Sequence, residues 1–142
     1  MTYIILASHG GLAKGMKDTL SMIIGDVSMI EAFSSYRDEH TTIKSEVEKT
    51  IKEKYNQNNI FILTDIFGGS VNTAMISLLE DYPKLHILSG MNLSLVISLT
   101  TQTDEISEES LKQIIYESKQ SIIDCNQLLK QYKQTSPAKK CQ

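Results

Sequence analysis

The chain has 142 residues, which is enough for one domain with a hydrophobic core but not for two. Its apolar fraction of 41%, charged fraction of 22% and formal net charge of -3 are typical of a soluble globular protein and argue against a nucleic-acid partner. No apolar run approaches the roughly 20 residues of a membrane helix and no signal peptide is recognisable, so we expect a cytoplasmic protein. Cys125 and Cys141 fit no metal-binding spacing, and we expect neither a metal nor a cofactor.

Short apolar segments alternate with amphipathic segments along most of the chain. In chain order, the pattern predicts a strand at 3–7, a helix at 12–24, a weaker strand at 28–32 and a helix at 43–55. It then predicts a strand at 60–64, a helix at 72–80, a strand at 85–88 and helices at 93–99 and from Ser107 onward. The alternation predicts an α/β fold with a single domain over 1–131, a doubly wound, mostly parallel open sheet with helices on both faces. The polar segment 132–142 is expected to be a flexible tail.

Three polar, glycine-containing segments follow three of the predicted strands. They are Ser8-His9-Gly10-Gly11, then Asp65 to Ser70, and then Ser89-Gly90-Met91-Asn92. In a doubly wound sheet, ligands bind outside the carboxyl ends of the strands, near the point where the strand order reverses. Because parallel strands end at the same edge of a sheet, we expect the three segments to line one site.

His9 and Asp65 are the candidate catalytic residues of this site. A histidine that carries a phosphoryl group needs one unprotonated, nucleophilic ring nitrogen, while the other nitrogen holds its proton against an acceptor. A carboxylate at Asp65 would supply that acceptor and orient the ring. Backbone N–H groups and a hydroxyl would then bind the phosphoryl oxygens, and we expect these donors from Gly10, Gly68, Gly69 and Ser70.

Taken singly, these residues have ordinary explanations. A lone histidine after a strand is more often a turn residue, and a lone aspartate more often caps a helix; their predicted convergence favours the phosphate-carrying interpretation. A Walker A motif fails because Met16 stands where its lysine belongs, and Gly-x-Gly-x-x-Gly is absent. Of the other histidines, His40 is expected to be solvated or to cap a helix, and His86 to be partly buried in a strand.

Three motifs in the same order carry a resemblance to a known family. They are Ala7-Ser8-His9-Gly10 with the helix after it, Asp65 to Ser70 in the form Asp-x-x-Gly-Gly-Ser, and Ser89-Gly90-Met91-Asn92-Leu93. Together they resemble the mannose-type (mannose/fructose/sorbose) IIA components of the bacterial phosphoenolpyruvate-dependent sugar phosphotransferase system, over about residues 1–130. Val71, Thr73 and Ser94 depart from the pattern, in which Val71 and Ser94 are often proline and Thr73 is asparagine. These departures affect the prediction of the partner-binding surface and of the sugar-specific branch of the family more than the prediction of the transfer chemistry.

The resemblance implies a phosphotransferase that is phosphorylated on Nε2 of His9 by the phosphocarrier HPr and passes the group to a IIB partner. It implies that Asp65 hydrogen-bonds the ring and that Ser70 lies near the phosphate. Sugar would enter through the membrane subunits IIC and IID, so this chain would meet the membrane only indirectly. The resemblance also implies a homodimer in which a short antiparallel strand, at 121–125, is exchanged between subunits, although the residue pattern equally allows a helix there.

Other functions remain open at this level. The phosphotransfer subunit of dihydroxyacetone kinase has the same fold and an early histidine, although the Asp-x-x-Gly-Gly-Ser form favours the sugar transporter. A regulatory module phosphorylated on His9 is a second alternative. A phosphatase or mutase acting through phosphohistidine is disfavoured, because Ser8 stands where those enzymes have arginine and Arg37 is the only arginine.

Overall fold

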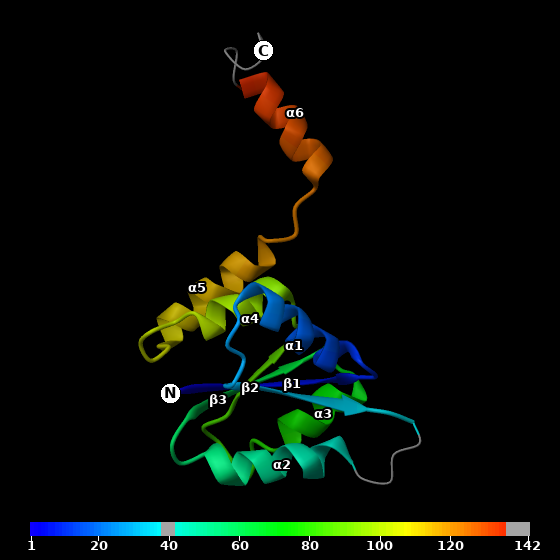
Figure 1. Ribbon diagram of the computed structural model, residues 1–142, viewed down its shortest axis with the longest axis vertical. Helices are drawn as coiled ribbons and strands as arrows, with labels where there is room; N and C mark the ends of the chain where they lie inside the picture. Colours follow the sequence, from blue (N-terminus) through cyan, green and yellow to red (C-terminus); the bar gives the residue numbers. More distant parts are fainter. Residues whose placement is uncertain (38–41, 136–142) are drawn as a thin grey trace.

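A computed structural model of the chain describes residues 1–37 and 42–135 (Figure 1). The expected capping residue His40 and the end of the chain from residue 136 lie outside these ranges. The strands are β1 (Thr2–His9), β2 (Ile30–Ser35), β3 (Asn59–Thr64) and β4 (His86–Ser89). The helices are α1 (Leu12–Ile23), α2 (Ile43–Lys54), α3 (Ser70–Ser77), α4 (Leu93–Thr100), α5 (Glu108–Lys119) and α6 (Cys125–Thr135).

The strands form one parallel sheet in the order β2-β1-β3-β4. The chain runs outward from β1 to β2, then crosses back to β3 on the other side of β1. The strand order therefore reverses between β1 and β3, the position at which doubly wound sheets bind ligands. The predicted doubly wound fold is confirmed.

Two hydrophobic cores lie on opposite faces of the sheet. Alternate residues of β1 point into different cores: Ile5 and Ala7 pack with α2 and α3, whereas Ile4 and Leu6 pack with α1, α4 and α5. Figure 1 shows these two helix layers above and below the sheet. Burial on both faces explains why β1 and β3 are continuous apolar runs rather than alternating ones.

The largest differences from the sequence-based boundaries are in β2 and α3, and the other elements differ by one or two residues at an end. The weak strand predicted at 28–32 is β2, which begins later and extends to Ser35, because Ser34 and Ser35 pair in register with Ser8 and His9 of β1. The helix predicted at 72–80 begins at Ser70 and ends at Ser77. In β2, pairing with β1 draws polar residues into a strand that hydrophobic periodicity alone does not extend to them.

The C-terminal part of the described chain leaves the body of the domain. Ser107 caps α5 as expected, its side chain accepting the backbone N–H of Ser110. Residues 121–124, within the proposed exchanged segment, form no strand with the described part of this chain, and Cys125 begins α6 instead. The expected boundary at 131 falls inside α6, which extends away from the sheet and its helices in Figure 1.

Candidate active site

His9 and Asp65 meet at the carboxyl edge of the two central strands. β1 and β3 are direct neighbours, with Ala7 paired to Thr64, so the residues that follow emerge side by side at the reversal point of the sheet. His9 is the last residue of β1, and Asp65 comes directly after β3. The predicted convergence of these two residues is present in the structure.

Asp65 holds His9 through both its backbone and its ring. The carboxylate oxygen Oδ2 accepts the backbone N–H of His9 at 2.8 Å and lies 2.7 Å from Nδ1 of the ring. On the other side of the ring, Nε2 lies 3.1 Å from Oγ of Ser70. With the proton on Nδ1 donated to Asp65, Nε2 is left with a free electron pair that the Ser70 hydroxyl can approach as a donor.

The carboxyl group of Asp65 is suited to this role by its environment. Partial burial acts to raise its pKa, but the hydrogen bonds from the backbone and ring of His9, with the charge of the ring, outweigh burial and lower the pKa below its usual range. The side chain of Asp65 is only 11% exposed, whereas that of His9 is 50% exposed. The site therefore joins a protected, ionised carboxylate to an accessible imidazole.

The loop between β3 and α3 brings its backbone close to the ring. Gly68 has φ +81°, a conformation that side-chain-bearing residues rarely adopt. A Cβ atom added at Gly69 would lie 3.3 Å from Cε1 of His9 and 3.0 Å from Cγ2 of Ile66. Glycine at this position therefore allows the ring to lie close to the start of α3. The first N–H groups of a helix have no partner within the helix and can bind an anion.

Gly10 and the segment after β4 take roles other than the expected ones. The N–H of Gly10 donates to the carbonyl of Ser35 at 2.9 Å, so Gly10 forms the turn after His9 and its own N–H is already committed. The N–H groups of Gly90 and Met91 donate to the carbonyl of Thr64, and Asn92 caps α4 through the N–H of Leu95. This third segment supports the end of β3 rather than touching the ring.

Among the described residues, four large apolar side chains remain exposed at this edge, three on loops and one at the first position of α1. They come from the segments after β1, β2 and β3, and we call them the apolar rim: Leu12, Tyr36, Ile66 and Phe67. Phe67 is the most open, at 78% exposure. Exposed aromatic and aliphatic side chains clustered around a polar centre are typical of a surface that a protein partner covers.

A buried hydrogen bond beneath the loop was not anticipated from the sequence. Thr64 is the last residue of β3 and Asn72 lies in the first turn of α3; Oγ1 of Thr64 donates to Oδ1 of Asn72 at 2.7 Å. A threonine and an asparagine eight residues apart form no known motif. Only the packing of α3 against the sheet brings them together.

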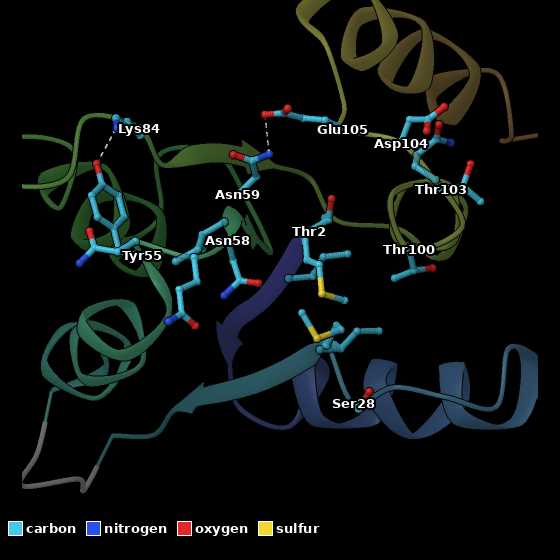
Figure 2. Close-up of a pocket in the computed structure, with 18 of the residues that line it drawn as sticks. Thr2, Ser28, Tyr55, Asn58, Asn59, Lys84, Thr100, Thr103, Asp104 and Glu105 are labelled. Carbon is cyan, nitrogen blue, oxygen red and sulfur yellow. Dashed lines mark hydrogen bonds between the residues drawn. The ribbon is translucent and has the colours of Figure 1, made fainter.

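A groove of about 640 Å³ lies at the opposite, amino edge of the sheet (Figure 2). Among the residues that line it are Thr2, Asn58, Asn59, Asp104 and Glu105, and Asn59 donates to Glu105 at 2.9 Å. None of the described residues that line it is a histidine or a cysteine. Within residues 1–37 and 42–135, no group of three acidic, histidine or cysteine side chains is placed to hold a metal ion.

The other described histidine, His86, lies apart from the site. Its ring stacks on Phe61 with centroids 4.5 Å apart, and its exposure is intermediate, as expected for a partly buried strand residue.

Among the described helices, none combines the length and the apolar character that crossing a membrane requires.

Comparison with known proteins gives a consistent result. The chain is 22% identical over 135 residues to the fructose-specific EIIA component of the PTS system of Bacillus subtilis (strain 168), covering 94% of this chain and 92% of that protein. It is 26% identical over 113 residues to the sorbose-specific EIIA component of Klebsiella pneumoniae, covering 80% and 83% of the two chains. A Klebsiella pneumoniae crystal structure, described as a phosphoenolpyruvate-dependent sugar phosphotransferase system (PTS) permease, is 32% identical and superposes with a TM-score of 0.80. The match covers 90% of this chain and 93% of that one.

A family model described as PTS system fructose IIA component matches residues 3–116, which include all of the sheet except Thr2 and the whole His9 site. The resemblance drawn from the three motifs is thereby confirmed. The chain belongs to the family of PTS fructose IIA components, the mannose-type IIA proteins of the sugar phosphotransferase system.

Proposed function

We propose that the chain is a phosphohistidine carrier that takes a phosphoryl group from phospho-HPr onto Nε2 of His9 and passes it to a IIB partner. The observation that carries this proposal is the hydrogen-bonded series Asp65–His9–Ser70, with distances of 2.7 Å to Nδ1 and 3.1 Å to Nε2. It leaves one ring nitrogen nucleophilic and the other held by a carboxylate. This is the arrangement that reversible phosphorylation of an imidazole needs.

The transfer step follows from these positions. The electron pair of Nε2 attacks the phosphorus atom while the nitrogen–phosphorus bond of the donor breaks and its electron pair returns to the donor ring. With Nδ1 still protonated, the ring of His9 gains positive charge, which the adjacent Asp65 carboxylate stabilises. The hydroxyl of Ser70 then turns from Nε2 to a phosphoryl oxygen, beside the N–H groups at the start of α3.

The surroundings of His9 favour a protein donor over a small molecule. The ring is half-exposed on an open edge, and the apolar rim of Leu12, Tyr36, Ile66 and Phe67 lies around it. Exposed apolar side chains at the same edge as a reactive group suit a partner that must dock, exchange a phosphoryl group and leave. We expect the donor and the acceptor to use this same surface in turn.

The setting of the reaction follows from the family. We place the chain in the cytoplasm, where the phosphoryl group would pass from IIB to sugar entering through IIC and IID, so that this chain meets the membrane only through its partners. The proposed reaction at His9 needs no metal or organic cofactor, because the phosphoryl group passes directly from a donor nitrogen to Nε2 and the donor ring is the leaving group. The net charge of -3 is in keeping with the absence of a nucleic-acid partner.

We infer that two copies associate through the C-terminal segment. Along α6, a single apolar face is formed by Cys125, Leu128, Leu129 and Tyr132. Ile122 and Ile123 just before it are exposed as well. An isolated helix of 11 residues is only marginally stable in water, so α6 needs a surface to pack on.

Sedimentation of wild type and a Leu128→Lys/Leu129→Lys variant tests this association. We expect wild type to be a dimer and the variant a monomer, and two identical monomers would contradict the inference.

The function is tested by incubating the chain with phosphoenolpyruvate, enzyme I and HPr and measuring the mass of the product. We expect the mass of one phosphoryl group to be added, to be lost in acid and to be absent in His9→Ala. A chain that stays unphosphorylated by a matched HPr, but is phosphorylated by the donor of a dihydroxyacetone kinase system, would move the assignment to that branch. Phosphorylation without onward transfer to any IIB would favour a regulatory module.

A further inference from the structure

We propose that Thr64 and Asn72 are positioning residues for the transfer, because their buried hydrogen bond sets the geometry of the loop that orients His9. Neither side chain touches the ring. The inference rests on the proposed function of His9. It identifies what keeps Asp65 and Ser70 at hydrogen-bonding distance from the ring of His9.

The loop from Asp65 to Ser70 meets the ring at both ends. At its start, Asp65 receives the backbone and ring N–H groups of His9. At its end, Ser70 lies against Nε2, and Gly69 packs so closely that an added Cβ would come within 3.3 Å of the ring. The ring is therefore held between the end of β3 and the start of α3, and its position depends on the separation of these two elements.

Thr64 and Asn72 link these two elements directly. Thr64 precedes Asp65 and is fully buried, while Asn72 lies two residues after Ser70 and is 2% exposed. Their 2.7 Å hydrogen bond is buried away from water. Hydrogen bonds are strongest in the protein interior, and the loss of one partner is most costly there. The carbonyl of Thr64 also accepts the N–H groups of Gly90 and Met91, so the turn after β4 is anchored at the same point.

A small displacement of α3 relative to β3 would change the positions of the reacting atoms. If α3 moves relative to β3, Ser70 and Gly69 move with it while Asp65 stays with the strand. Group-transfer rates are sensitive to misplacements well below 1 Å, and supporting residues typically contribute about 10- to 100-fold to activity. The hydrogen bond thus acts on the orientation of the ring as well as on stability.

The decisive variant is Thr64→Val, which removes the hydroxyl and keeps the shape of the side chain. Thr64→Ser keeps the hydroxyl and is the conservative rescue. Thr50→Val is the matched control, because Thr50 is another buried threonine, and its Oγ1 donates to Glu31 in the packing of α2 against β2. Asn72→Ala tests the other partner of the bond. Denaturant unfolding of each variant measures the loss of stability that any buried hydroxyl would cause.

Two readouts separate positioning from simple destabilisation. We expect Thr64→Val and Asn72→Ala to take up phosphate about tenfold more slowly than wild type, with Thr64→Ser and Thr50→Val within about twofold. In nitrogen-15 spectra of the unphosphorylated protein, we expect wild type to show the proton on Nδ1 of His9, and Thr64→Val to show a mixture of tautomers. Thr64→Val or Asn72→Ala matching Thr50→Val in both rate and ring signals would overturn the proposal. Because the ring signals need no phosphate donor, they test positioning even if wild-type uptake itself fails.

Discussion

The two edges of the sheet differ in cavity size and in how their polar groups are arranged, and the two properties do not go together. The amino edge has a groove of about 640 Å³ with many polar groups, whereas His9 at the carboxyl edge lies on an open surface. At the carboxyl edge the polar groups are aligned: the ring of His9 contacts Asp65 at 2.7 Å and Ser70 at 3.1 Å. At the amino edge, Asn59 and Glu105 pair with each other, and none of the described residues that line the groove is a histidine.

The physical cause of this difference is the common direction of the strands. Chain segments leaving parallel strands at their carboxyl ends pass directly into helix N-termini, which supply unpaired N–H groups and favour negative charge. Segments arriving at the amino ends come from helix C-termini, where unpaired carbonyl groups dominate. A phosphoryl group is therefore favoured at the His9 edge and disfavoured at the other.

The largest effect is expected from His9→Ala, which should reduce phosphoryl uptake to background. The side chain is half-exposed and contributes little to either core, so the free energy of unfolding should change by less than about 1 kcal/mol. Mass measurement after incubation with the donor system and a denaturant titration provide the two readouts. His86→Ala is the control: it loses the stacking on Phe61 but should be phosphorylated normally. Phosphorylation of the His9 variant would show that another residue carries the group.

Asp65→Asn should slow uptake on the order of 10²- to 10⁴-fold without abolishing it. The nucleophile survives, but an amide cannot supply the negative charge that stabilises the ring, and its N–H₂ group favours the wrong tautomer. Rapid-quench measurement of the phosphorylated fraction gives the rate. Asp26→Asn is a suitable control, because Asp26 lines the groove at the amino edge. Equal rates for the two variants would remove Asp65 from the mechanism.

Gly69→Ala should reduce uptake about tenfold while leaving the protein folded. The backbone of Gly69 has φ -73°, which alanine tolerates, so the effect would come from the new Cβ atom against the ring of His9 and Ile66. Gly15→Ala provides the comparison, since nothing lies within 4 Å of a Cβ at Gly15 inside α1. That variant should gain about 0.5–1 kcal/mol of stability and keep the wild-type rate. A Gly69 variant with the wild-type rate would mean that the close approach is not needed.

The smallest effect is expected at the amino edge. Asp104→Asn and Asn59→Ala alter the groove of Figure 2 and should leave the uptake rate within about twofold of wild type. The same rapid-quench assay applies. A loss comparable with that of Gly69→Ala would show that the two edges are coupled through the sheet, and the contrast between them would then need revision.

Much of the architecture could be predicted because its signals are local. A strand buried on both faces requires a continuous apolar run, and 3–7 and 60–64 both lie within observed strands. Helical periodicity likewise located α1, α2 and α4 to within a few residues. The convergence of His9 and Asp65 followed from topology, because both residues come at the ends of strands that a doubly wound sheet places near its reversal point.

Other features could not be predicted because they depend on partners distant in sequence. β2 extends through Ser34 and Ser35 because β1 lies beside it, although neither serine favours a strand. Gly10 was expected to bind phosphate, but its N–H is taken by Ser35, a partner known only once the two strands are paired. The hydrogen bond of Thr64 with Asn72 depends on the packing of α3 against β3.

The sequence by itself determined the fold class and the convergence of His9 and Asp65 at one edge of the sheet, because these depend on periodicity and chain direction. Only the tertiary structure decided which atoms meet: Oδ2 with Nδ1, Oγ of Ser70 with Nε2, and Thr64 with Asn72 beneath them. The physical reason is that hydrophobic patterning specifies which face of an element is buried to within a residue or two. Hydrogen bonds require atoms placed to within a few tenths of an ångström, and only the packing of whole elements provides that precision.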